Sequence, residues 1–233
     1  MCLLHVTRLQ LQSRPSLIEW IFHVAEDLGL SKRAVHLAIY LLDHFMDRHN
    51  IKPSHLQLVA LGCILVAVKY EHGDVCSFGT MNDYATEKYP LKDIKHMELL
   101  ILTFFEWDLT MPTIAEFAEL FMRSAVTIGD LLHGKKISCM VVTQRALLDR
   151  FSFFLTASLE DVRYLDAPPS VVASACLACS RQTLGITPLW PMRMRMLTRH
   201  TSNDIRPFVL ILLQSLHSSN PSPDTGYGSD GLD

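Results

Sequence analysis

The 233-residue sequence predicts an all-α fold, and three observations support this prediction. The stretch Leu58–Val68 contains no charged residue, so a helix there must be buried on all sides. In Val35–Met46, apolar residues recur three and four positions apart, which is typical of a helix with one buried face. No segment shows the strict apolar–polar alternation of a half-buried strand. We therefore expect Leu58–Val68 to form the central helix of a helical domain.

Length and composition indicate a protein with ample material for a core. A chain of this length forms one or two domains, and 49% of its residues are hydrophobic. The uncharged stretch is shorter than the ~20 residues that a membrane-spanning helix needs, so we predict no membrane contact. A formal net charge of −3 argues against a general nucleic-acid binder. The six cysteines form no disulfide pattern, which predicts reduced thiols and an intracellular protein, in the nucleus or the cytoplasm.

Start and stop signals define the first helices. The sequence predicts a helix over Arg14–Leu28, with Pro15 in its first turn and Gly29 just past its end. A second helix, Ser31–Arg48, begins with a serine that can cap its first turn. Pro53 then opens the central helix. These three helices precede the first polar stretch of the chain.

The polar stretch Gly73–Lys88 is predicted to be a loop with room for a short helix. A fourth long helix follows, with its inward-facing residues in Ile94–Phe105. Pro112 then interrupts the pattern, and Thr113 can cap a further helix over Ile114–Thr127. The first domain is accordingly predicted to span residues 14–128.

The stretch Gly129–Gly134 is predicted to join two domains, because the helical pattern begins again after it. We place the second domain at residues 135–217. The tail, residues 218–233, is rich in Pro, Gly, Ser and Asp and is predicted to be disordered. The predicted helices of the second domain are Val141–Leu155, Leu159–Leu165, a long apolar helix opened by Pro168 and Pro169, Met192–Arg199 and Asn203–His217.

Four segments resemble the cyclin box in order and spacing: VHLAIYLLDHFMDR, LQLVALGCILVAVKYEH, HMELLIL and FFEWDLTMPT. The resemblance covers about Arg14–His217. It implies an N-terminal cyclin box at 14–128 and a C-terminal cyclin fold at 135–217, each of five helices. It also implies a non-enzymatic role, as the activating subunit of a cyclin-dependent serine/threonine kinase in cell-cycle control. The expected partner is the kinase catalytic subunit, with the chain a monomer outside that complex.

The resemblance assigns the family's kinase-binding lysine to Lys69 and its glutamate to Glu98. In cyclins these two residues bond to the kinase backbone near its movable helix. An ammonium group donates and a carboxylate accepts, which suits a backbone partner. The alternative is an internal ion pair between neighbouring helices, and both can hold. The apolar part of the same surface is expected at Val66, Tyr70, Leu102, Trp107 and Leu109, for which ordinary core packing is the alternative.

Asp43 lies among apolar neighbours, where an unpaired carboxylate would be costly, so it needs a cationic partner. The resemblance supplies Arg14 as that partner, in a structural ion pair. It also implies a degenerate substrate-docking patch on the first helix, because Ser13 and Ser16 stand where the family has apolar anchors. The patch residues that remain are Leu17, Trp20, Leu56 and Gln57.

Other chemistry has little support in the sequence. Cys176 and Cys179 form a CxxC inside an apolar helix, but no second pair stands at zinc-site spacing. No phosphate-binding loop, HExxH or GxSxG motif is present. We therefore expect no metal, no cofactor and no enzymatic activity. The alternative function is a cyclin-fold transcription factor that binds DNA or polymerase, which the net charge of −3 and the presence of both Lys69 and Glu98 disfavour.

Overall fold

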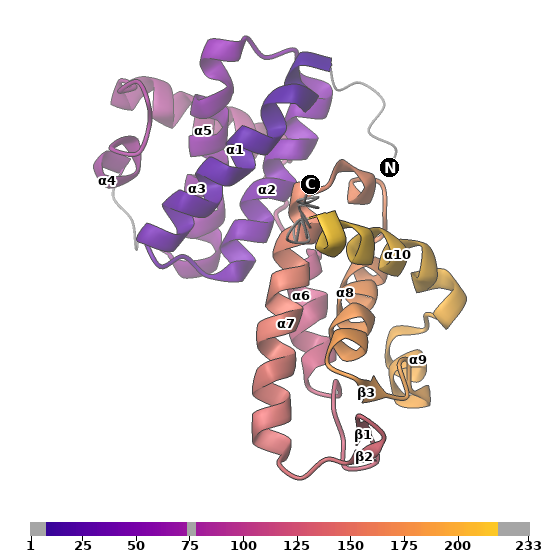
Figure 1. Ribbon diagram of the computed structural model, residues 1–233. Coiled ribbons are helices and arrows are strands. Elements are labelled where there is room, and N and C mark those ends of the chain that lie inside the picture. Colours follow the sequence, from indigo (N-terminus) through magenta and orange to yellow (C-terminus); the bar gives the residue numbers. More distant parts are fainter. Residues whose placement is uncertain (1–7, 74–77, 219–233) are drawn as a thin grey trace, which may run out of the picture.

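The computed structural model describes residues 8–73 and 78–218, which form two helical domains in tandem (Figure 1). The all-α prediction is confirmed. The N-terminal domain contains α1 (Arg8–Asp27), α2 (Lys32–Arg48), α3 (Leu56–His72), α4 (Phe78–Asn82) and α5 (Leu91–Phe104), and a 3₁₀ helix, Pro53–His55, precedes α3. The C-terminal domain contains α6 (Ile114–Met122), α7 (Met140–Glu160), α8 (Pro169–Thr183), α9 (Met192–Thr198) and α10 (Ser202–Ser218), with a 3₁₀ helix at Val162–Tyr164.

Helix α3 is the centre of the N-terminal domain, as its uncharged sequence predicts. Every residue from Leu58 to Val68 is buried, and α2 and α5 pack along its length. Among the described residues, Pro53–His72 is the one stretch long and apolar enough to cross a membrane, and 67% of its most apolar window is buried in the protein. That burial is typical of a core helix.

Helix α1 begins at Arg8, so the predicted start at Arg14 is wrong and Pro15 lies inside the helix. A tertiary contact explains the earlier start. The side chain of Gln10 is buried, and its Nε2 donates to the carbonyl oxygens of Met46 and His49 at the end of α2, at 3.4 and 2.7 Å. This anchor holds the first turns against the domain although Pro15 provides no backbone donor.

The packing places α6 in the second core, whereas the sequence prediction assigned Ile114–Thr127 to the first domain. Phe121 and Ala118 of α6 are buried with residues of α7 and α8. The break at Pro112, followed by the cap at Thr113, therefore marks the change of core. With this division each domain has five α-helices within the described residues.

The predicted joint Gly129–Gly134 overlaps a small antiparallel sheet, which the search for strict apolar–polar alternation did not reveal. Strands β1 (Leu131–Leu132) and β2 (Lys135–Lys136) form a hairpin, and β1 also pairs with β3 (Ile186–Thr187). His133 and Gly134 connect β1 to β2 with φ angles of 50° and 76°, as in a type I′ turn. Two-residue strands are too short to show alternation. The tail predicted to be disordered lies outside the described residues from position 219 onward.

Candidate functional site

Helices α3 and α5 lie against each other at Gly62, and this contact positions the candidate site. A Cβ atom at Gly62 would lie 2.8 Å from both Met97 Cγ and Ile101 Cδ1 of α5. No side chain larger than hydrogen fits there without a shift of those two side chains. Glu98 follows Met97 directly on α5, so the close contact sets where its carboxylate meets α3.

Lys69 and Glu98 form an ion pair with an Nζ–Oε1 distance of 2.6 Å. Lys69 lies in the last turn of α3, just after the buried stretch ends. The side chains are 35% and 14% exposed, respectively. Lys69 therefore keeps surface for an outside partner, while Glu98 is held mostly inside. The sequence reasoning proposed both an internal pair and a partner site, and the geometry accommodates both.

A shallow hollow of about 410 Å³ lies beside this ion pair. Trp107 forms part of its lining and is 65% exposed. The turn that ends α5 sets the place of Trp107, because Glu106 and Trp107 adopt φ angles of 52° and 63° and the Trp107 N–H donates to the Leu102 carbonyl at 2.9 Å. The remaining lining residues are Lys69, Lys95, Glu98, Leu99 and Leu102.

The predicted apolar residues of the kinase-facing surface divide into two groups. Tyr70 and Trp107 are exposed and Leu102 is half-buried. Val66 and Leu109 are buried in the first core, so they are core residues and not surface residues. Helix α3 is apolar on all sides, so its sequence does not indicate in which direction Val66 points. Leu99, which was not predicted, is 51% exposed and lines the hollow.

The predicted pair of Arg14 and Asp43 is present and buried. Arg14 donates from Nε and Nη2 to the two carboxylate oxygens of Asp43, at 2.7 and 2.9 Å. It also donates to the carbonyl oxygens of Leu159 and Glu160 at the end of α7, at 2.8 and 3.1 Å. Burial raises the pKa of Asp43, and the hydrogen bonds from Arg14 act in the opposite direction. The pair therefore joins the two domains.

The chain itself covers the degenerate docking patch. Leu17 and Leu56 are buried in the first core. The Trp20 indole N–H donates to the Tyr84 carbonyl at 2.9 Å, and the Gln57 side-chain oxygen accepts from the Thr86 N–H at 3.0 Å. The two polar groups of the patch are thus bonded to the segment after α4.

A second buried cluster was missed from the sequence. Asp130 accepts hydrogen bonds from Arg181 Nη2 at 3.1 Å and Arg193 Nη1 at 3.0 Å, and from the Thr127 N–H at 2.9 Å. Burial raises the pKa of Asp130, but the hydrogen bonds from Arg193 and Arg181 outweigh it, so this pKa lies below its usual value. Arg181 could have indicated this cluster in the sequence. It is a charged residue near the end of the apolar α8 and, like Asp43, it needs a partner of opposite charge.

The CxxC thiols are buried in the second core. Cys176 Sγ lies 3.4 Å from the Phe154 carbonyl oxygen, and Cys179 Sγ lies 3.6 Å from that of Val209. Burial raises the pKa of both thiols. Within the described residues, no group of three or more His, Cys, Asp or Glu side chains is placed to hold a metal ion.

Comparisons with known proteins identify both domains. The family model for the N-terminal domain of cyclins matches residues 2–110, and that for the C-terminal domain of cyclins matches residues 112–226. Cyclin-J of Xenopus laevis is 37% identical over 212 residues, covering 88% of this chain and 55% of that protein. Cyclin-J of Homo sapiens is 36% identical over 200 residues, covering 82% and 50%. The chain thus spans about half the length of these curated relatives.

Solved structures share the fold at low identity. A viral cyclin from herpesvirus saimiri matches with a TM-score of 0.69 and 14% identity, over 90% of this chain and 88% of that one. A chain of the yeast RNA polymerase II CTD kinase complex CTDK-1 matches with a TM-score of 0.66 and 14% identity, over 89% and 66%. Two family models that together match nearly the whole chain, in the tandem five-helix arrangement, show that the chain belongs to the cyclin family.

Proposed function

We propose that the chain is the activating subunit of a cyclin-dependent serine/threonine kinase in cell-cycle control. The observation that carries this proposal is the Lys69–Glu98 ion pair at the protein surface, beside the exposed Trp107. Relatives of the chain bear the names Cyclin-J and G2/mitotic-specific cyclin-A, which supports a regulatory role in cell division. A kinase partner also agrees with the match to a chain of a yeast kinase complex.

The site suits a partner backbone. Glu98 holds Lys69 in place, and the Lys69 side chain is 35% exposed, so a backbone carbonyl of the partner can reach the ammonium group, which is a hydrogen-bond donor. Such charge-assisted hydrogen bonds contribute about 1.5–3 kcal/mol each. The apolar Trp107, Leu99 and Leu102 surround the pair and would exclude water from these bonds when the kinase docks. If the pair binds the active arrangement of the kinase better than the inactive one, binding shifts the population toward the active form.

The test is the double variant Lys69→Ala with Glu98→Ala, because removing both partners leaves no stranded charge. Its matched control is Lys88→Ala with Asp83→Ala, which removes an exposed ion pair of 2.8 Å in the same domain. We expect the first double variant to lose capture of cyclin-dependent kinases from a purified panel, and to lose histone phosphorylation. We expect the control to keep both. Circular dichroism melting should remain cooperative for each.

Two results would contradict the proposal. If the Lys69 and Glu98 double variant folds and activates the kinase fully, the ion pair is only structural. If the wild-type chain captures no kinase of the panel, the kinase role fails as a whole. These outcomes separate the site assignment from the function.

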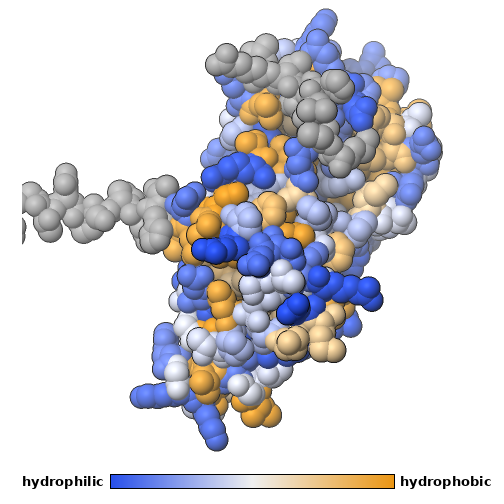
Figure 2. Space-filling view, turned by 90° about the vertical axis from the view of Figure 1, so that its right-hand side faces the viewer, coloured by the Kyte–Doolittle hydropathy of each residue, from blue (hydrophilic) through white to orange (hydrophobic). Residues whose placement is uncertain are grey.

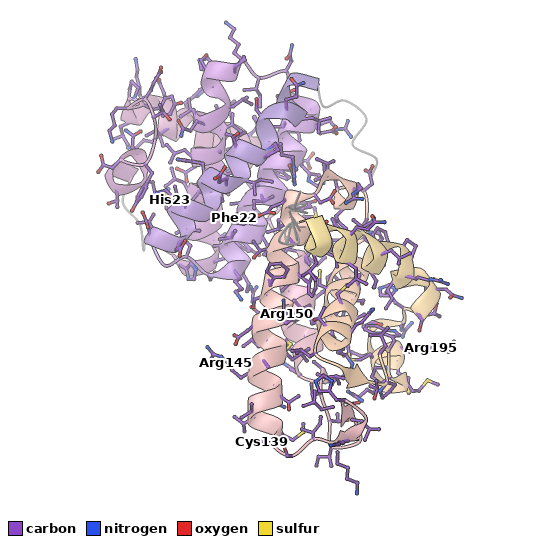
Figure 3. The ribbon with its side chains drawn as sticks, viewed as in Figure 1. Phe22, His23, Cys139, Arg145, Arg150 and Arg195 are labelled. Atoms are coloured by element: carbon purple, nitrogen blue, oxygen red, sulfur yellow. The ribbon has the colours of Figure 1, made fainter. Side chains whose placement is uncertain are left out.

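Nucleic-acid binding has no comparable support. The formal net charge is −3. In Figure 3, Arg145 on α7 and Arg195 on α9 lie on opposite sides of the C-terminal domain, and Arg145 is engaged by Asp149 at 3.4 Å. Hydrophobic and hydrophilic residues are mixed in small clusters on the face seen in Figure 2. Salt-dependent DNA binding by the purified chain would favour the alternative function.

A further inference from the structure

A cavity of about 450 Å³ lies between the two domains, and we call it the inter-domain cavity. Helix α2 forms one wall, with His36, Tyr40 and Asp43. The opposite wall comes from the stretch between Leu159, at the end of α7, and Pro169, at the start of α8. The volume falls in the range of small-molecule sites, which often lie at domain interfaces.

The walls of the inter-domain cavity are mainly apolar and partly flat. The rings of Tyr40 and His44 lie 4.0 Å apart at 31°, and a 3.0 Å contact between His44 Nδ1 and the Tyr40 carbonyl oxygen fixes this arrangement. Flat aromatic walls favour flat ligands that stack on them. Further apolar lining comes from Ile39, Pro112, Leu159, Leu165, Pro168 and Pro169.

The charged groups of the lining already have partners. Arg14 is bonded to Asp43 and to two backbone carbonyls, and Asp166 has an interaction partner of its own. Burial lowers the pKa of His36 to about 3, so its imidazole is neutral at pH 7. An ionised ligand would lose its hydration in this cavity and find no free opposite charge.

Buried polar atoms in proteins are nearly always bonded. Among the described residues, two buried polar atoms of the lining have no hydrogen-bond partner, Thr113 Oγ1 and His36 Nδ1. The His36 ring belongs to the lining of the inter-domain cavity. A small rotation of the imidazole toward the cavity would allow a ligand group to supply the missing hydrogen bond.

We propose that the inter-domain cavity binds an uncharged, flat aromatic small molecule, with one polar group bonded to His36. The apolar volume, the neighbouring aromatic rings and the paired charges select the class, and His36 orients the ligand. The ligand would contact both domains at once, since α2 and the α7–α8 connection form opposite walls. This site is separate from the Lys69–Glu98 surface and does not depend on kinase binding.

The test uses prodan, an uncharged and flat naphthalene ketone whose fluorescence reports an apolar site. Fluorescence titration of the full chain should show saturable binding of prodan and much weaker binding of the anionic dye ANS. Ala167→Phe places a ring in the inter-domain cavity and should weaken prodan binding about tenfold or more, which corresponds to about 1.4 kcal/mol. The matched control, Ala157→Phe, lies in a different hollow between α7 and α10 and should bind prodan as the wild type does.

A second variant keeps the test decisive if Ala167→Phe does not fold. His36→Phe retains a ring of similar shape and removes the polar atoms, so it should weaken prodan binding about fivefold. Binding of ANS as tight as that of prodan would overturn the proposed ligand class. Wild-type affinity for prodan in a folded Ala167→Phe chain, or in His36→Phe, would overturn the proposed site.

Discussion

The guanidinium of Arg14 holds Asp43 and the end of the next domain's α7 at the same time. Its Nη2 lies 2.9 Å from Asp43 Oδ2 and 2.8 Å from the Leu159 carbonyl oxygen. The ion pair is therefore a joint between the domains as well as part of the first core. A buried ion pair of this kind stabilises the folded chain little more than apolar residues of similar size would, but removing one of its two partners is costly.

Arg14→Met is expected to destabilise the chain by about 3–5 kcal/mol, because it leaves the Asp43 carboxylate buried without a counter-charge. Arg14→Met with Asp43→Leu should recover most of that loss. Urea unfolding followed by circular dichroism measures both. The control is Arg145→Met, which removes an exposed pair with Asp149 and should leave the unfolding midpoint unchanged. Equal stability of Arg14→Met and the wild type would contradict a buried, charged pair.

The stability of the chain should fall between pH 6.5 and pH 5 because of His36. Burial, and secondarily the charge of Lys32, lowers its pKa from 6.5 to about 3. The unfolded chain therefore binds a proton below pH 6.5 that the folded chain does not, so stability is lost as the pH falls. The loss is about 2 kcal/mol at pH 5. Urea unfolding at pH 6.5 and pH 5 should show that His36→Phe does not have this loss of stability.

The exposed His55 provides the matched control for that prediction. His55→Phe removes an imidazole from the surface and should keep the wild-type dependence of stability on pH. If His36→Phe and the wild type lose equal stability between pH 6.5 and pH 5, then His36 is not a buried neutral histidine.

Short Arg-x-Leu peptides should bind weakly to the first-helix patch. Besides the serines at positions 13 and 16, the patch groups of Trp20 and Gln57 are already bonded to Tyr84 and Thr86. A peptide must displace that segment before it can dock. Calorimetric titration should detect no binding at micromolar peptide, whereas micromolar affinity would mean that the segment is easily displaced.

What could be predicted from the sequence depended on local charge and apolar pattern. The buried stretch of α3 and the need of Asp43 for a cation follow from single segments. The direction in which Val66 points could not be predicted, because α3 is apolar on every side and has no polar face that would show which side is exposed. Arg181 and Asp130 lie far apart in the chain. Their pairing depends on tertiary packing, which the hydrophobic periodicity of single segments does not indicate.

The domain boundary shows a conflict between two local signals. The restart of the helical pattern after Gly129–Gly134 favoured a joint there, whereas Pro112 and Thr113 mark the actual change of core. The two glycines instead flank β1, and Gly134 is needed at the positive φ of the β1–β2 turn. A turn inside a domain and a linker between domains can have the same amino-acid composition. Only the pairing of the segment with residues distant in the sequence distinguishes them.

The last prediction concerns Gly62, which lies on α3 before Lys69 and sets the geometry of the proposed kinase-binding surface. Gly62→Ala places a Cβ 2.8 Å from the side chains of Met97 and Ile101, so these side chains must shift or α5 must move away from α3. Overpacking of this kind costs about 1–3 kcal/mol, and the better helix propensity of alanine offsets about 1 kcal/mol of it. Stability should therefore fall modestly, while the Lys69–Glu98 contact lengthens and kinase capture weakens more strongly.

Gly129→Ala is the matched control, because its Cβ would meet nothing within 4 Å. Kinase capture and melting of that variant should equal those of the wild type. Gly62→Ala with Met97→Ala removes one of the two colliding side chains and should restore part of the capture. If Gly62→Ala captures the kinase as the wild type does while its melting temperature falls, then the α3–α5 contact stabilises the fold without positioning the ion pair.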